Sequence, residues 1–113
     1  MSMTDAQISR ALALAIGYRP EDVRTAPDAC KVVEVNRPCI YGDSWYRFDY
    51  DLPDVIWRVA ERFDCFPVRS YPCGTEATVW QAYLPSQTTR YVVADTAAKA
   101  VALAVIKAHG GGV

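Results

Sequence analysis

The sequence TAAKAVALAVIKAH, residues 96–109, decides the fold class of this chain. Between residues 97 and 108 only two lysines are polar, so a helix formed here is apolar on nearly every side. Such a helix must be almost surrounded by other parts of the protein. Asp95 and Thr96 are residue types that cap helix starts, and a run of glycines follows the segment. The segment therefore predicts a buried helix that needs other layers around it.

Two further segments have the periodicity of amphipathic helices. In the first, the Thr4 hydroxyl can accept a bond from a free backbone amide, and the Gln7 side chain can accept one from the Thr4 amide. Gly17 is expected to end this helix. In the second, Asp51 is expected to cap the start and Pro53 lies in the first turn. The core-facing residues are Ile8, Ala11, Leu12, Ala15 and Ile16 in the first helix, and Ile56, Val59, Ala60 and Phe63 in the second.

Strands are expected where β-branched and aromatic residues dominate. We expect a connecting loop with one turn over residues 18–29, which contain two prolines and several charges. The expected strands are residues 30–36, 44–50, 65–71, 76–84 and 90–94. Apolar residues on both strand faces require helical cover. The sequence therefore predicts an α/β (α+β) fold, a three-layer α/β/α sandwich with a mainly antiparallel sheet, in the order helix-β-β-helix-β-β(-β)-helix.

Length and composition are those of one globular domain, residues 1–113, with a flexible tail at 110–113. Thirteen acidic residues against twelve basic ones give a net charge of −1, without the basic surplus that drives binding to nucleic-acid phosphates. No signal peptide is recognisable at the start, and no apolar run is long enough for a membrane span. We therefore expect a cytoplasmic protein with reduced cysteines, no membrane partner and no default nucleic-acid partner.

Several short motifs resemble one known family. The dipeptide YD at 50–51 before a helix with Trp57, WQAY at 80–83, ADTAA at 94–98 and VIKA at 105–108 are similar to the phage ABA sandwich family. These are small proteins of bacteriophages and prophages. The resemblance covers about residues 5–17 and 47–109, and it implies a three-layer α/β/α sandwich and a phage or prophage origin. It implies no activity, catalytic residue or cofactor, and residues 35–43 match nothing in the family.

Two groups of residues raise the question of a metal site. The four cysteines are Cys30, Cys39, Cys65 and Cys73, and the acidic residues of the middle segment are Asp43, Asp49, Asp51 and Asp54. Zinc sites favour closely spaced cysteine pairs, which this sequence lacks. The spacing of a calcium loop, with its glycine and terminal Glu, is also absent. His109, the one histidine, is expected at the C-terminal end of a helix, where it interacts favourably with the helix dipole. We therefore expect no metal, no cofactor and no catalytic nucleophile.

The aromatic residues are more informative than the cysteines and the carboxylates. Trp57 and Trp80 have apolar neighbours and are expected in the core. An aromatic side chain beside arginine is the composition that interaction hot spots favour. The candidate interaction face is Tyr41, Asp43, Trp45, Arg47 and Asp49. The alternative is that this face simply lies against the first helix.

The favoured interpretation is a small phage-derived accessory protein, not an enzyme, that binds a host or phage protein, for example to inhibit a bacterial defence system. Two alternatives stay open. One is a nucleic-acid-binding module whose arginines gather on one face beside tyrosines. Those arginines are Arg47, Arg58, Arg62, Arg69 and Arg90. The other is a metal- or small-ligand-binding protein or enzyme, and a homodimer through a sheet edge or the aromatic face is also compatible with the sequence.

Overall fold

The computed structural model describes residues 4–25, 33–70, 79–84 and 92–109. Within them the chain forms three α-helices, one short 3₁₀ helix and two three-stranded antiparallel sheets. The helices are α1 (Asp5–Ala15), α2 (Pro53–Phe63) and α3 (Ala97–His109), and the 3₁₀ helix is η1 (Pro20–Asp22). The strands are β1 (Val23–Thr25), β2 (Val33–Asn36), β3 (Trp45–Arg47), β4 (Val68–Ser70), β5 (Val79–Ala82) and β6 (Val92–Ala94).

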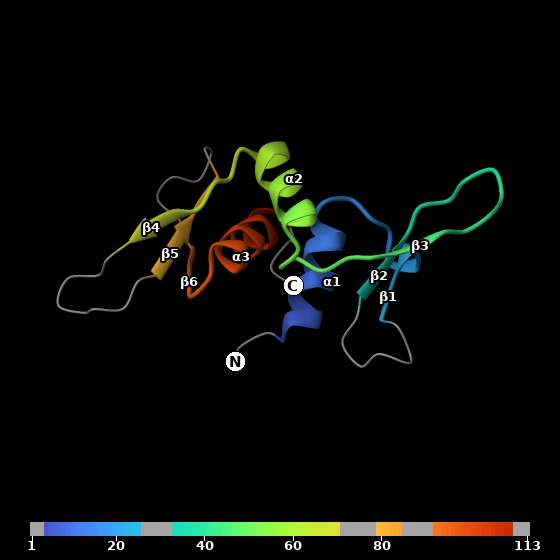
Figure 1. Ribbon diagram of the computed structural model, residues 1–113, viewed down its shortest axis with the longest axis horizontal. Coiled ribbons are helices and arrows are strands. Elements are labelled where there is room, and N and C mark those ends of the chain that lie inside the picture. Colours follow the sequence, from blue (N-terminus) through green and yellow to red (C-terminus); the bar gives the residue numbers. More distant parts are fainter. Residues whose placement is uncertain (1–3, 26–32, 71–78, 85–91, 110–113) are drawn as a thin grey trace.

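The helices lie in the middle of an elongated molecule of 55 × 30 × 24 Å, and the two sheets lie at opposite ends (Figure 1). Helix α1 packs on β1 and β2, whereas α3 packs on β5 and β6, and α3 also contacts both other helices. The α+β class, the antiparallel pairing and the alternation of helices with groups of strands are confirmed. The layers, however, run sheet, helices, sheet, so that α3 is enclosed by helices on one side and a sheet on the other.

Helix α3 has the burial that its sequence predicts. Its fully or almost fully buried residues are Ala100, Val101, Ala102, Ala104, Val105 and Ile106. The small alanines let neighbouring backbones approach closely, and the Thr96 hydroxyl accepts a 3.2 Å bond from the Lys99 amide, as expected for the cap. Burial on several sides at once explains why this helix needs almost no polar face.

Helix α1 begins with the predicted capping box. The Thr4 amide donates to Gln7 Oε1 at 2.8 Å, and the Gln7 amide donates to Thr4 Oγ1 at 3.2 Å. Ile8 and Leu12 are completely buried. Gly17 follows the helix with φ of 117°, a left-handed conformation that favours glycine. The first turn and the apolar face of α1 are thus both fixed locally by sequence.

Helix α2 departs from the sequence prediction in two places. Asp51 does not cap the helix, because Leu52 occupies the cap position and makes no side-chain capping bond. The Asp51 amide instead donates to Asp49 Oδ1 at 3.0 Å, so the chain turns before the helix begins. Trp57, expected in the core, is 53% exposed. The buried face of α2 is narrow, since Ile56, Val59 and Ala60 fill it, and the neighbouring position 57 points outward.

Strand β1 is the element that the sequence analysis missed. Residues 18–29 were expected to be a loop with one turn; the turn is η1, but Val23–Thr25 pairs with β2 in antiparallel register, with Val23 opposite Val35. Val23 is 5% exposed, and this burial stabilises a strand whose charged and proline neighbours hide it in the sequence. The Arg10 side chain adds a 3.3 Å bond to the Val23 carbonyl oxygen.

The other strands fall inside their expected ranges, and β3, β4 and β5 are shorter than expected within the described residues. Strand β3 ends at Arg47, although Phe48 and Tyr50 beyond it are buried on the face that the alternation predicts. The Tyr50 amide donates to the buried Ser9 hydroxyl at 3.1 Å, which ties this segment to α1. Residues 30–32, 71–78, 85–91 and the expected tail at 110–113 lie outside the described part of the chain.

Candidate functional site

The hairpin between β2 and β3 extends away from the helices and forms one end of the molecule (Figure 1). At its tip Cys39 and Gly42 pair across a β-turn, with 2.9 and 3.0 Å bonds between their backbone groups. Gly42 has φ of 114°, which a side chain would strain. The two central residues of the turn, Ile40 and Tyr41, are 91% and 93% exposed. We call these two residues the hairpin tip.

The base of the hairpin is held by one buried side chain. Asn36 is 7% exposed, and its Nδ2 donates to Asp22 Oδ1 at 3.2 Å and to Asp43 Oδ1 at 3.1 Å. Its Oδ1 accepts a 3.1 Å bond from the Ser44 amide. The Arg19 guanidinium, 2.9 Å from Asp22 Oδ2, holds the pKa of the Asp22 carboxyl below its usual value. The base is therefore fixed to η1 by polar contacts.

The structure brings together only some of the residues predicted to form the interaction face. Tyr41 lies at the tip, whereas Asp43 is engaged by Asn36 at the base. Arg47 and Asp49 form an ion pair of 3.3 Å, and Arg47 pairs across the sheet with Glu34, which in turn pairs with Arg24. Trp45 is half-buried, because the guanidinium of Arg24 lies 4.0 Å from the centre of its ring. Trp45 and Arg47 thus lie on the same face of the sheet, whereas Tyr41 lies apart from them at the tip.

Two important residues of the hairpin were missed by the sequence analysis. Ile40 is as exposed as Tyr41, and an isoleucine two residues before a turn glycine, Gly42, is the signal that could have found it. Asn36 was assigned only to a strand. Its anchoring role depends on Asp22, fourteen residues away, and no local pattern reveals such a contact.

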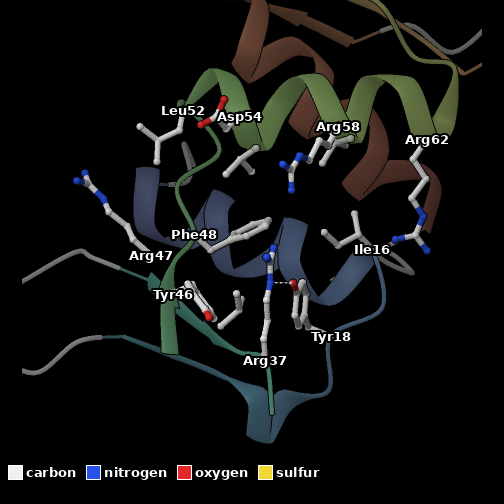
Figure 2. Close-up of a pocket in the computed structure, with 13 residues that line it drawn as sticks. Ile16, Tyr18, Arg37, Tyr46, Arg47, Phe48, Leu52, Asp54, Arg58 and Arg62 are labelled. Carbon is white, nitrogen blue, oxygen red and sulfur yellow. Dashed lines mark hydrogen bonds between the residues drawn. The ribbon is translucent and has the colours of Figure 1, made fainter. Parts of the chain in front are cut away.

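A pocket of about 350 Å³ lies at the base of the hairpin, between β2–β3, the end of α1 and one face of α2 (Figure 2). Val35, Phe48 and Val59 line it with buried apolar side chains. Tyr18 packs edge-on against Phe48, with ring centres 6.1 Å apart. The pocket is thus apolar on the inside, and its wall comes from segments far apart in the sequence.

Charged side chains surround this apolar interior. Among the described residues, its lining includes four arginines and one aspartate, which are Arg37, Arg47, Arg58, Arg62 and Asp54. Arg37 and Arg58 extend toward each other from opposite walls, whereas Arg47 points away from them (Figure 2). Arg37 Nε donates to the Tyr18 hydroxyl at 3.2 Å, and its guanidinium lies 5.3 Å from the centre of the Tyr46 ring. The pocket therefore combines a concentrated positive charge with aromatic rings.

The other candidate centres are not assembled in the described residues. No group of three or more metal-ligating side chains occurs there. Cys39 is exposed and Cys65 is buried, and burial raises the pKa of the Cys65 thiol to about 11; Cys30 and Cys73 lie outside the described residues. The imidazole of His109 stacks near the Phe63 ring at 4.7 Å, a packing contact at the end of α3.

Two carboxylates, Asp5 of α1 and Asp49 of the middle segment, are engaged by protein groups. Asp5 Oδ1 accepts a 2.8 Å bond from the Tyr50 hydroxyl, and burial together with this bond raises the pKa of that tyrosine. Asp49 binds Arg47 and the Asp51 amide. These bonds make Asp49 part of the turn between β3 and α2, and the Asp5 bond ties Tyr50 to α1.

The fold and the site define a small α+β protein with a projecting apolar hairpin tip and a basic, aromatic pocket. No helix in the described residues has the length and apolar character needed to cross a membrane. Comparison with known proteins gives no match: no family model, curated protein or solved structure is significantly similar to this chain.

Proposed function

We propose that this protein is a small phage- or prophage-encoded accessory factor that works in the bacterial cytoplasm by binding a partner protein of the host or the phage. The observation that carries the proposal is the hairpin tip, where Ile40 and Tyr41 are 91% and 93% exposed. The phage origin rests on the resemblance of short motifs within residues 5–17 and 47–109 to the phage ABA sandwich family. Inhibition of a host defence protein is one activity that such binding would serve.

The tip has the composition and position of a binding anchor. Tight turns usually carry small or polar residues, whereas this turn places an isoleucine and a tyrosine in water. Tyrosine is enriched among residues that dominate binding energy, because it supplies a large contact area at a small entropic cost. Neither side chain contributes to the core, so its exposure is explained by a partner rather than by folding.

The fixed base of the hairpin favours the same conclusion. Asn36 holds η1 and the second arm of the hairpin together through three hydrogen bonds. The backbone of the turn is closed by two more bonds between Cys39 and Gly42. A loop already held in one conformation loses less entropy when it binds. The tip is thus presented on a preorganised support.

The test is capture of the partner with a matched pair of variants. The tip variant is Ile40→Ser with Tyr41→Ser, and the control is Val93→Ser with Tyr83→Ser, which removes one aliphatic and one tyrosine side chain, 47% and 40% exposed, outside the hairpin. Tagged proteins are expressed in bacteria with and without phage infection. We expect the wild type and the control to recover the same stoichiometric partner, and the tip variant to lose it.

Two results would count against the proposal. One is a partner that binds the tip variant as tightly as the wild type. The other is the absence of any stoichiometric partner for the wild type in both kinds of cell. Far-UV circular dichroism of each variant shows whether it is folded, so that loss of binding is not confused with loss of structure.

The nucleic-acid alternative has one specific observation in its favour. Arg47, Arg58 and Arg62 do line the same pocket beside Tyr46. Arg69, in contrast, lies on β4 in the other sheet, and Arg90 is outside the described residues. The arginines therefore surround a pocket rather than a continuous strip along which a strand could lie. Binding of single- and double-stranded DNA over a salt series tests this alternative directly.

A further inference from the structure

The pocket at the base of the hairpin has a charge that the rest of the protein does not share. Arg47 points away and pairs with Asp49, which leaves Arg37, Arg58 and Arg62 facing the single carboxylate of Asp54, in a chain whose net charge is −1. Arg58 and Arg62 have no carboxylate partner among the described residues, although several acidic side chains elsewhere are paired. The three guanidinium groups therefore outnumber the one carboxylate in the described lining, and they repel one another.

An anion placed among these groups would remove that repulsion. Arg37 from β2's end and Arg58 from α2 converge on the pocket from opposite walls, and Arg62 lies one helical turn beyond Arg58 (Figure 2). The planar guanidinium group binds phosphate and carboxylate through paired hydrogen bonds. Several such groups around one point fit the multiple oxygens and the double charge of a phosphate monoester better than a single carboxylate.

The interior of the pocket is complementary to an apolar ring rather than to an anion. Val35, Phe48 and Val59 present an apolar floor, and Tyr46 lies under Arg37 at the edge. Aromatic rings and guanidinium planes stack favourably on flat rings. The volume of about 350 Å³ is within the range of small-molecule sites, which run from about 300 to 1,000 Å³. The pocket can therefore hold a ring as well as the anionic group attached to it.

We propose that this pocket binds a small phosphorylated compound with an aromatic ring, of which a nucleoside monophosphate is the simplest example. The phosphate lies between Arg37, Arg58 and Arg62, and the ring lies on the floor formed around Phe48. Asp54 is the one acidic residue in the described lining, and it opposes the anion. The site uses neither Ile40 nor Tyr41, so it stands independently of the protein-binding tip.

The experiment is calorimetric titration with AMP, UMP and phenyl phosphate, and with adenosine and inorganic phosphate as the two half-ligands. At least one of the three ring phosphates should bind more tightly than either half-ligand. Arg58→Ala should weaken it about tenfold or more, the loss expected for one charged hydrogen-bonded contact. Lys107→Ala, which removes one exposed positive charge from α3, is the matched control and should leave affinity unchanged.

Asp54→Asn supplies a prediction of opposite sign. It removes the opposing charge from the pocket, so affinity for the ring phosphate should rise a few-fold, whereas a variant that only disturbs folding would lower it. The Ile40→Ser, Tyr41→Ser tip variant should bind the ring phosphate like the wild type. Failure of the tip proposal and failure of the pocket proposal are thereby distinguishable.

Four outcomes would overturn the pocket proposal. The first is no saturable binding of any of the three ring phosphates. The second is binding of inorganic phosphate as tight as that of the ring phosphates, which would show an unspecific anion site. The third is an Arg58→Ala variant with unchanged affinity. The fourth is much tighter binding of a single-stranded oligonucleotide with the same dependence on Arg58, which would favour the nucleic-acid interpretation.

Discussion

Helix α3 and the hairpin tip use apolar residues in opposite ways. In α3, Val101 and Val105 are 2% and 0% exposed, and alanines let a sheet and two helices approach them. At the tip, Ile40 and Tyr41 are almost completely exposed, and the chain around them is held by hydrogen bonds instead of apolar packing. The difference shows that the hairpin tip keeps its conformation without burying its large side chains, while the helical centre supplies the apolar burial that stabilises the fold.

The largest effect should separate these two regions directly. Leu12→Ala removes a completely buried side chain from α1, where it packs in the helical centre, and should lower the free energy of unfolding by about 2–5 kcal/mol. Ile40→Ala is the matched control at the tip and should change it by no more than about 0.5 kcal/mol. Urea unfolding followed by circular dichroism measures both. Similar losses would show that the tip is part of the core after all.

The next effect should concern the base of the hairpin. Asn36→Ala leaves the partners of a buried side chain without their bonds, and should lower the free energy of unfolding by about 1–3 kcal/mol. Amide hydrogen exchange should also become faster at Cys39 and Gly42. Ser44→Ala is the control, because its hydroxyl makes only a 3.8 Å contact with Cys39 Sγ. Unchanged exchange at the turn would mean that Asn36 does not hold the hairpin.

The free energy of unfolding should depend on pH through the buried thiol of Cys65. Burial raises the pKa of Cys65 from 9.0 to about 11, with a smaller contribution from Asp64. The unfolded chain therefore releases this proton first, and the stability present below pH 9 is progressively lost as the pH rises toward 11. Cys65→Ala should flatten the decline, whereas Cys39→Ala, at an exposed position, should not. Equal slopes for the two variants would contradict the prediction.

The rise in the pKa of Tyr50 acts in the same direction at higher pH. Its hydroxyl donates to Asp5, and burial also favours the neutral form, so the folded protein keeps this proton after the unfolded chain has lost it. In the Cys65→Ala protein, the additional substitution Tyr50→Phe should remove the decline in the free energy of unfolding that remains above about pH 10. Unfolding curves at several alkaline pH values separate the two contributions.

The smallest effect should occur on the surface of the first sheet. Arg24 pairs with Glu34 at 3.1 Å and covers the Trp45 ring, but its side chain is 48% exposed. Arg24→Ala should lower the free energy of unfolding by less than about 1 kcal/mol, and the difference should shrink with added salt. Arg58→Ala removes an unpaired arginine and should cause no loss. A larger loss at Arg58 would argue against an uncompensated basic pocket.

Residues with strong local signals were predicted well. The Thr4–Gln7 capping box, the Thr96 cap, the turn at Pro20–Asp22 and the burial of α3 all follow from patterns within a few neighbouring residues. Strand β1 was missed because its three residues pair with partners eight to twelve positions away. Asp51 was wrongly assigned as a cap because a carboxylate before a proline fits that role as well as it fits a turn.

The candidate site was predicted only in part, for the same reason. The sequence placed aromatic and charged residues on the segment that becomes the hairpin, and it singled out Tyr41 and Arg47. It did not show that Asn36 would reach Asp22, or that Arg37 and Arg58 would converge on one pocket. Those contacts join β2 to η1 and to α2, and each depends on how separate elements pack.

The sequence by itself determined most of the elements: three helices and five of the six short strands. Periodicity, capping residues and glycine positions act over a few residues, so they can be recognised without knowing the fold. Only the tertiary structure decided that the strands form two sheets on either side of the helices. It also decided that four arginines line one apolar hollow, because burial and electrostatic repulsion are properties of residues brought together from distant parts of the chain.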